Sequence, residues 1–181
     1  MSVARNDRVR PGGADISTST TVLSAARYGA WMAEASRPAE RGFDDVLCYL
    51  EWWDCPRSGV TSVDGAAMHF ASPFDEKLDD YVAQFYLWAA TDQEVGDALE
   101  VWHAFAAWRA RFDAGEKPPP FASLNESASQ RRVHELAQQG PPVTALRAVP
   151  EWRLDLNRSF VGHVPQHKVR WTFLSDTTMD A

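Results

Sequence analysis

Residues 46–63 read Val-Leu-Cys-Tyr-Leu-Glu-Trp-Trp-Asp-Cys-Pro-Arg-Ser-Gly-Val-Thr-Ser-Val, and this stretch decides the fold. Its first part, 46–53, is largely apolar at both odd and even positions. Successive side chains of a strand point to opposite faces, so the pattern predicts a strand that is covered on two sides. The next part, 54–59, contains Asp, Pro, Ser and Gly, which are typical of turns. We therefore expect a strand that leads directly into a turn.

A hairpin should follow this turn. A short strand is expected at 60–63, and Asp64-Gly65 after it is the dipeptide favoured in tight two-residue hairpins. The partner strand should then occupy 67–71. Together with the first strand, these residues predict a three-stranded antiparallel meander.

The central helix has clear start and stop signals. Thr91 and Glu94 have the spacing of a capping box, in which each side chain satisfies a backbone N–H of the other residue. The helix should reach Asp113, where Gly115 provides a left-handed stop. We expect it to pack on the sheet through a broad apolar face, which includes Leu99, Trp102, Phe105, Ala106 and Phe112.

The remaining segments complete an α+β fold, in which a mostly antiparallel sheet packs against this Trp-rich central helix. An N-terminal helix is expected at 22–36, and a further surface helix at 126–139. We expect a disordered tail at 1–19 and a single domain over 20–176. An acidic connection that could form one helical turn is expected at 74–80, and further extended segments at 81–90, 144–149, 152–156 and 168–174. Pro150 argues for an edge strand or a bulge.

Composition and charge narrow the classes of function. The chain of 181 residues carries a net charge of −7, which argues against nonspecific binding to nucleic acid or to an anionic membrane. No apolar run approaches the roughly 18 residues that a membrane helix needs. Two cysteines, Cys48 and Cys55, make a disulfide framework unexpected. We therefore expect a cytoplasmic protein without cofactors.

The opening strand also carries a resemblance. The run Leu47 to Asp54, followed by Pro56 to Val60, resembles a family of small uncharacterised bacterial proteins. The resemblance extends to the acidic connection, the Trp-rich helix and a closing strand, and it covers 45–115 and 143–174. Cys55 departs from it, because the family pattern implies Gly there. The resemblance implies a similar fold and no known activity.

The first turn holds the most suggestive polar residues. Glu51 and Asp54 are two carboxylates with the guanidinium of Arg57 nearby, and neighbouring charges can push carboxylate pKa values apart for acid–base chemistry. The structural alternative is a turn in which Asp54 caps the backbone and Arg57 pairs with a carboxylate.

Candidate metal ligands lie elsewhere in the chain. Glu100 and His103 have the spacing that places two ligands on one helix face, and His163 and His167 could chelate if a turn brought them together. The acidic connection offers oxygen ligands without the EF-hand spacing. No second Glu-x-x-His motif exists and Pro165 forbids helical alignment of the last two histidines, so no metal site is expected.

Aromatic residues suggest the leading hypothesis. The tryptophans exceed what a core of this size can easily hide, and exposed Trp and Arg are typical anchors of binding surfaces. We expect a non-enzymatic domain that binds a protein or a small ligand through an aromatic groove between the sheet and the central helix. Its candidate residues are Trp53, Arg57, Trp108 and Arg109. The alternatives are a small hydrolase-like enzyme that uses Glu51 and Asp54, or a metal protein that uses His103 with His163 or His167.

Overall fold

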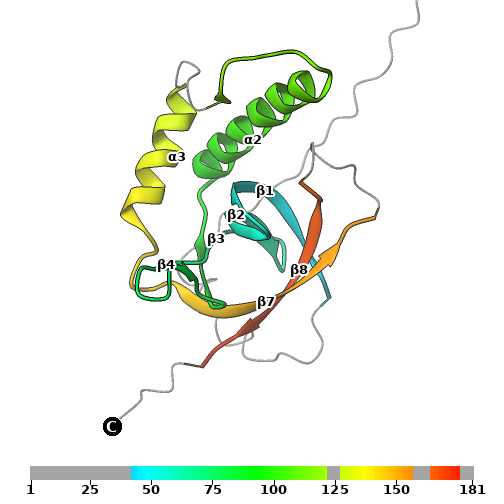
Figure 1. Ribbon diagram of the computed structural model, residues 1–181. Helices are drawn as coiled ribbons and strands as arrows, with labels where there is room; N and C mark the ends of the chain where they lie inside the picture. Colours follow the sequence, from blue (N-terminus) through cyan, green and yellow to red (C-terminus); the bar gives the residue numbers. More distant parts are fainter. Residues whose placement is uncertain (1–41, 122–126, 157–163, 176–181) are drawn as a thin grey trace, which may run out of the picture.

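The chain forms an α+β fold in which six antiparallel strands close into a barrel (Figure 1). The computed structural model describes residues 42–121, 127–156 and 164–175. The tail expected at 1–19 and the helix expected at 22–36 lie outside these residues. The barrel strands are β1 (Asp44–Trp52), β2 (Pro56–Val63), β3 (Ala66–Ala71), β6 (Phe85–Ala89), β7 (Leu146–Leu154) and β8 (His167–Phe173).

The barrel is a closed meander. Each strand pairs with the next one in the order β1-β2-β3-β6-β7-β8, and β8 returns to β1 through Asp44 opposite Val169. The closing pairing is short, because it joins only Asp44 and Asp45 to Val169 and Lys168. Two helices, α2 (Asp92–Asp113) and α3 (Ala128–Gln139), are inserted between β6 and β7. The predicted sheet is thus confirmed as antiparallel, and it is closed on itself.

Large rings fill the barrel. Phe70 of β3, Phe85 of β6, Trp152 of β7 and Trp171 of β8 contact one another with centroids 5.6–6.2 Å apart. β3 and β8 are not neighbours in the sheet, so these rings meet across the interior. Gly59 lies opposite Phe70, where a Cβ atom would come within 2.2 Å of the carbonyl oxygen of Cys48. Only glycine fits at this position.

The predicted hairpin is confirmed. Asp64 and Gly65 have positive φ angles of 50° and 80°, as a type I′ turn requires, and they join Val63 to its partner Ala66.

The central helix is confirmed at both ends. Thr91 and Glu94 form the reciprocal capping box at the start of α2. At the other end, Gly115 has a φ of 84°, and the N–H groups of Gly115 and Glu116 donate to the carbonyls of Phe112 and Arg111. This is a Schellman motif. Local sequence signals therefore fix both ends of the helix.

α2 lies across one side of the barrel, beside β1, and α3 packs next to it (Figure 1). Trp102 is buried against Tyr49 of β1, with ring centroids 5.3 Å apart. Ser127 caps α3. In the part of the chain that the structure describes, no helix has both the length and the apolar character that a membrane crossing requires.

Two expected boundaries were wrong. The turn expected at 54–59 is shorter, because β2 already begins at Pro56 and Ser58 pairs with Glu51. Proline is tolerated at the first position of a strand, and Gly59 belongs to β2 because it pairs with Tyr49 of β1 and Phe70 of β3. The two strands expected on either side of Pro150 are one strand, in which Pro150 pairs with Trp171.

The acidic connection forms a small hairpin in place of the expected helical turn. Its strands are β4 (Phe74–Asp75) and β5 (Asp80–Tyr81). The carboxylate of Asp75 accepts hydrogen bonds from the N–H groups of Lys77 and Leu78, so it stabilises the turn between the two strands. The strand expected at 81–90 is correspondingly shorter, because β6 begins only at Phe85.

Candidate functional site

A groove of about 670 Å³ runs between the outer face of the barrel and α3. Its floor comes from β1, β2, β3 and β6, its roof from α3, and one end from the β4–β5 hairpin. The lining is mostly apolar, with Leu50, Ala71, Phe74, Trp88, Val133, Leu136, Ala137 and Pro141. Volumes of 300–1,000 Å³ are typical of sites for small organic ligands.

Strand alternation places His69 on the groove floor. Its neighbour Phe70 points into the barrel, so the His69 side chain points outward, and it lines the groove. The imidazole is 2% exposed and stacks on Trp88, its cross-strand partner, at a centroid distance of 5.2 Å. Its Nε2 lies 3.5 Å from Oε2 of Glu94 and forms no hydrogen bond among the described residues. Burial lowers the pKa of His69, and the charge of Glu94 only partly opposes this.

The other end of the groove is polar and aromatic. Tyr81 Oη donates to Oε1 of Glu51 at 2.5 Å, and Trp53 Nε1 donates to the same oxygen at 3.2 Å. Phe74 meets Tyr81 edge to face, with centroids 5.3 Å apart. Glu51, Phe74 and Tyr81 all line the groove, whereas Trp53 is 68% exposed beside it. Burial, followed by the hydrogen bond to Glu51, raises the pKa of Tyr81.

Arg57 lies directly behind this end. Its guanidinium covers the Tyr81 ring at 4.5 Å and donates to Oδ1 of Asp54 at 2.8 Å. That hydrogen bond lowers the pKa of Asp54. The structure thus brings Glu51, Trp53 and Arg57 together around Tyr81, while Asp54 is tied to Arg57 away from the groove lining.

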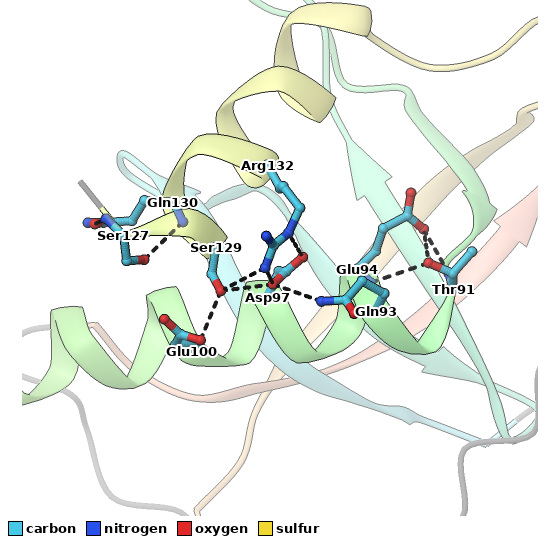
Figure 2. Close-up of polar contacts among 9 residues, drawn as sticks. All are labelled: Thr91, Gln93, Glu94, Asp97, Glu100, Ser127, Ser129, Gln130 and Arg132. Carbon is cyan, nitrogen blue, oxygen red and sulfur yellow. Dashed lines mark hydrogen bonds and ion pairs between the residues drawn. The ribbon is translucent and has the colours of Figure 1, made fainter.

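A polar cluster joins α3 to α2 and so holds the groove roof in place (Figure 2). Arg132 of α3 donates to the buried carboxylate of Asp97 on α2, with Nε at 2.6 Å from Oδ2. Ser129 Oγ lies 2.8 Å from a carboxylate oxygen of Asp97 and 2.8 Å from one of Glu100, so its single hydroxyl proton is shared between the two acceptors. The hydrogen bond from Arg132 holds the pKa of Asp97 well below its usual range. We call the polar contact between the two helices, formed by Asp97, Ser129 and Arg132, the helix clamp.

The other two predicted ligand-binding residues lie elsewhere. Trp108 and Arg109 are on the second half of α2, and neither is among the described residues that line the groove. Trp108 Nε1 donates to the carbonyl of Pro119, and Arg109 pairs with Asp113. Four rings stack along this helix face at centroid distances of 5.6–6.0 Å, namely Trp102, Phe105, Trp108 and Phe112. The four residues predicted to bind a ligand therefore lie in two places. Trp53 and Arg57 are near the groove, and Trp108 and Arg109 are on the second half of α2.

The candidate metal ligands do not converge. Glu100 accepts from Ser129, His103 is exposed on α2, and His167 packs against Tyr49 and Trp52. His163 lies outside the described residues. Over residues 42–121, 127–156 and 164–175, no three His, Cys, Asp or Glu side chains gather in a way that could hold a metal ion.

Neither cysteine is activated. Burial raises the pKa of the Cys48 thiol to about 12. Cys55 lies beside Arg57, whose positive charge favours the thiolate and so acts to lower the pKa of Cys55. It is the less buried of the two, but partial burial raises its pKa as well, and this outweighs the charge of Arg57.

The fold and the groove define a small antiparallel β-barrel with a two-helix layer and a ligand-sized site beneath the second helix. No model of a known protein family matches the chain, and the comparisons with curated proteins and with solved structures found no similar protein. The site must therefore be interpreted from its own geometry.

Sequence reasoning missed His69, Trp88 and the role of α3. In β6, Phe85 and Leu87 are buried and Trp88 lies on the opposite face, whereas all residues of β3 from Ala66 to Phe70 are buried, so alternation could indicate Trp88 but not His69. Pairing of β3 with β6 places the two rings opposite each other. For α3, the thin apolar stripe that includes Val133 and Leu136 indicated a surface helix, and the same stripe forms the groove roof.

Proposed function

We propose that this protein is a binding domain for a small, largely apolar molecule, which it holds in the groove between α3 and the barrel. One observation carries the proposal: a ligand-sized concavity with an apolar lining has a few polar groups at defined places. The aromatic groove predicted from the sequence becomes, in this proposal, a groove over β3 and β6 under α3.

The distribution of side chains supports a small ligand over a protein partner. Apolar residues of α3 face apolar residues of the barrel across the groove, so a bound molecule would be covered on two sides. Polar groups stand at one end around Glu51, and His69 lies on the floor. Such a division would fix the orientation of a ligand that has one polar end.

The hydrolase alternative requires both carboxylates to reach one substrate. Glu51 lines the groove, whereas Asp54 is not among the described residues that line it. The side chain of Asp54 is 79% exposed and paired with Arg57. The geometry therefore favours binding over paired-carboxylate chemistry.

Titration with the neutral dye Nile red tests the proposal, because its emission rises in an apolar site. We expect a saturable rise with about one dye per chain. Ala137→Trp should abolish the rise, because Ala137 lines the groove and the indole would fill it. Ala128→Trp is the matched control, since Ala128 is exposed on the same helix and does not line the groove.

Equal dye binding by the wild type and Ala137→Trp would contradict the proposal, and so would the absence of any saturable signal. Circular dichroism of both variants shows whether each one folds. A comparable loss of binding in Ala128→Trp would assign the effect to damage of α3 and would also count against the groove.

A further inference from the structure

From the charges around the groove we infer that its ligand is an apolar amine, with the ammonium group at Glu51 and the hydrocarbon part between Trp88 and α3. This inference rests on the proposed function and specifies its ligand class. The juxtaposition of one carboxylate with aromatic rings at the end of an apolar groove carries it.

The first argument is charge. Glu51 is the one carboxylate among the described residues that line the groove, and no Lys or Arg is among them. The histidines of the lining are His69 on the floor and His134 on α3. The guanidinium of Arg57, which lies behind this end of the groove, is paired with the carboxylate of Asp54. The polar end of the groove is therefore negative, and a cationic ligand complements it.

The second argument is the state of the Glu51 carboxylate. Both of its hydrogen bonds, from Tyr81 and Trp53, go to Oε1. No described residue donates to Oε2. The side chain is therefore fixed through one oxygen, while the second can accept a charged hydrogen bond from an ammonium group.

The third argument is the aromatic surroundings. Phe74 lines the same end of the groove and is 49% exposed, whereas the Tyr81 ring is already covered by the guanidinium of Arg57. Ring faces attract cations through their quadrupole, and the attraction grows as the cation loses water. The rest of the groove offers Leu50, Trp88 and Leu136 to a hydrocarbon chain or ring.

Three molecules of the same shape and different charge test the inference: 4-phenylbutylamine, 4-phenylbutan-1-ol and 4-phenylbutanoate. In isothermal titration calorimetry at pH 7, the amine should bind about tenfold or more tightly than the other two, as one charged hydrogen bond implies. Equal or tighter binding of the carboxylate would overturn the inference.

Two variants with the same change of net charge locate the ammonium site. Glu51→Gln keeps an oxygen that can accept from Tyr81 and Trp53, and it should weaken the amine by about tenfold while leaving the alcohol unchanged. Asp113→Asn should leave the amine unchanged, because Asp113 pairs with Arg109 on α2 and does not line the groove. Equal weakening by both variants would reduce the effect to general electrostatics and overturn the inference.

A further probe separates a free amine from a lysine side chain of a partner. N-acetyl-lysine methylamide carries the same ammonium group without the aromatic end, and it should bind about tenfold more weakly than 4-phenylbutylamine. Equal affinity would overturn the apolar part of the inference. If the alcohol binds and the amine binds no more tightly than the alcohol, the inferred ligand class is wrong, but the groove is still a binding site. If none of the three shaped molecules binds, the proposed function itself falls.

Discussion

A histidine buried in a protein makes the free energy of unfolding depend on pH. His69 lies against Trp88 and the barrel, and its pKa is lowered because burial disfavours the charged imidazolium. The charged groups around it are Glu94 at 3.5 Å and the Asp97–Arg132 pair, which lines the same small cavity between the helices and the sheet. Glu94 favours the imidazolium but does not overcome burial.

The sign of the effect follows from linkage. The folded state holds His69 neutral below the ordinary pKa of 6.5, whereas the unfolded chain takes up a proton there. The contribution of neutral His69 to the free energy of unfolding is therefore fully present above about pH 6.5. It is lost as the pH falls through that value toward the lowered pKa of His69 in the folded protein.

We predict that the urea concentration at the unfolding midpoint of the wild type decreases as the pH is lowered from about 7 to about 5. In His69→Gln the midpoint should depend less steeply on pH, because glutamine does not titrate in this range. His103→Gln, which replaces an exposed histidine on α2, should keep the wild-type slope. The change of the midpoint with pH is compared between the proteins, because the midpoint itself can differ between His69→Gln and the wild type at every pH. An unchanged slope in His69→Gln would show that His69 does not control the pH dependence.

At the residue scale, the sequence predicted the polar end of the site better than its floor. Glu51 and Arg57 were singled out as a carboxylate beside a guanidinium, and Trp53 as an exposed ring; they lie together in the structure because they are close in sequence. His69 and Trp88 meet only because β3 pairs with β6 in one particular register. Such a register depends on contacts that no local pattern specifies.

The element on which the groove depends is α3. It has 12 residues, mostly polar, and a helix of this length is marginal on its own in water. Its capping box at Ser127 and Gln130 sets where it begins, and the helix clamp fixes it to α2. Its position over the groove therefore depends on a few polar contacts as well as on its thin apolar stripe.

We predict that Asp97→Asn loosens α3 while the barrel persists, because the charged hydrogen bonds from Arg132 lose their anionic acceptor. The loss should be about 1–3 kcal/mol, the value of hydrogen bonds to charged groups. Hydrogen exchange should speed up in the amides of α3 and not in those of β2 and β3. Nile red should bind more weakly.

The control is Asp113→Asn, which removes a carboxylate of α2 that pairs with Arg109 outside the helix clamp. It should leave exchange in α3 unchanged. Equal protection of α3 in Asp97→Asn and the wild type would show that the apolar stripe alone holds the helix.

Both described helices and the meander were predictable from local signals at the scale of elements. The capping box and the Gly115 stop of α2 and the Asp64-Gly65 turn act over a few residues, and each is confirmed. The acidic connection misled because its charge pattern does not distinguish a helical turn from the β4–β5 hairpin. Closure of the barrel pairs β8 with β1, which are far apart in the sequence, and no local sequence pattern specifies that pairing.

At the scale of the whole molecule, the barrel and the helix layer have separate tasks. The interior of the barrel is filled by aromatic rings, which leaves the outer face for a ligand. The two helices lie on one side of the barrel (Figure 1). The groove lies between the outer face of the barrel and α3. The aromatic stack on the second half of α2, around Trp108, is a separate surface.

The location of a neutral ligand tests this account most directly. Backbone and indole ¹⁵N chemical shifts should be followed as 4-phenylbutan-1-ol is added, since this method detects weak binding and reports its place. We predict saturable shifts at Ala71, Trp88, Val133 and Leu136, which face one another across the groove. Shifts confined to Trp108, Arg109 and their neighbours on α2, or no saturable shifts, would contradict the claim that the groove beneath α3 is the binding site.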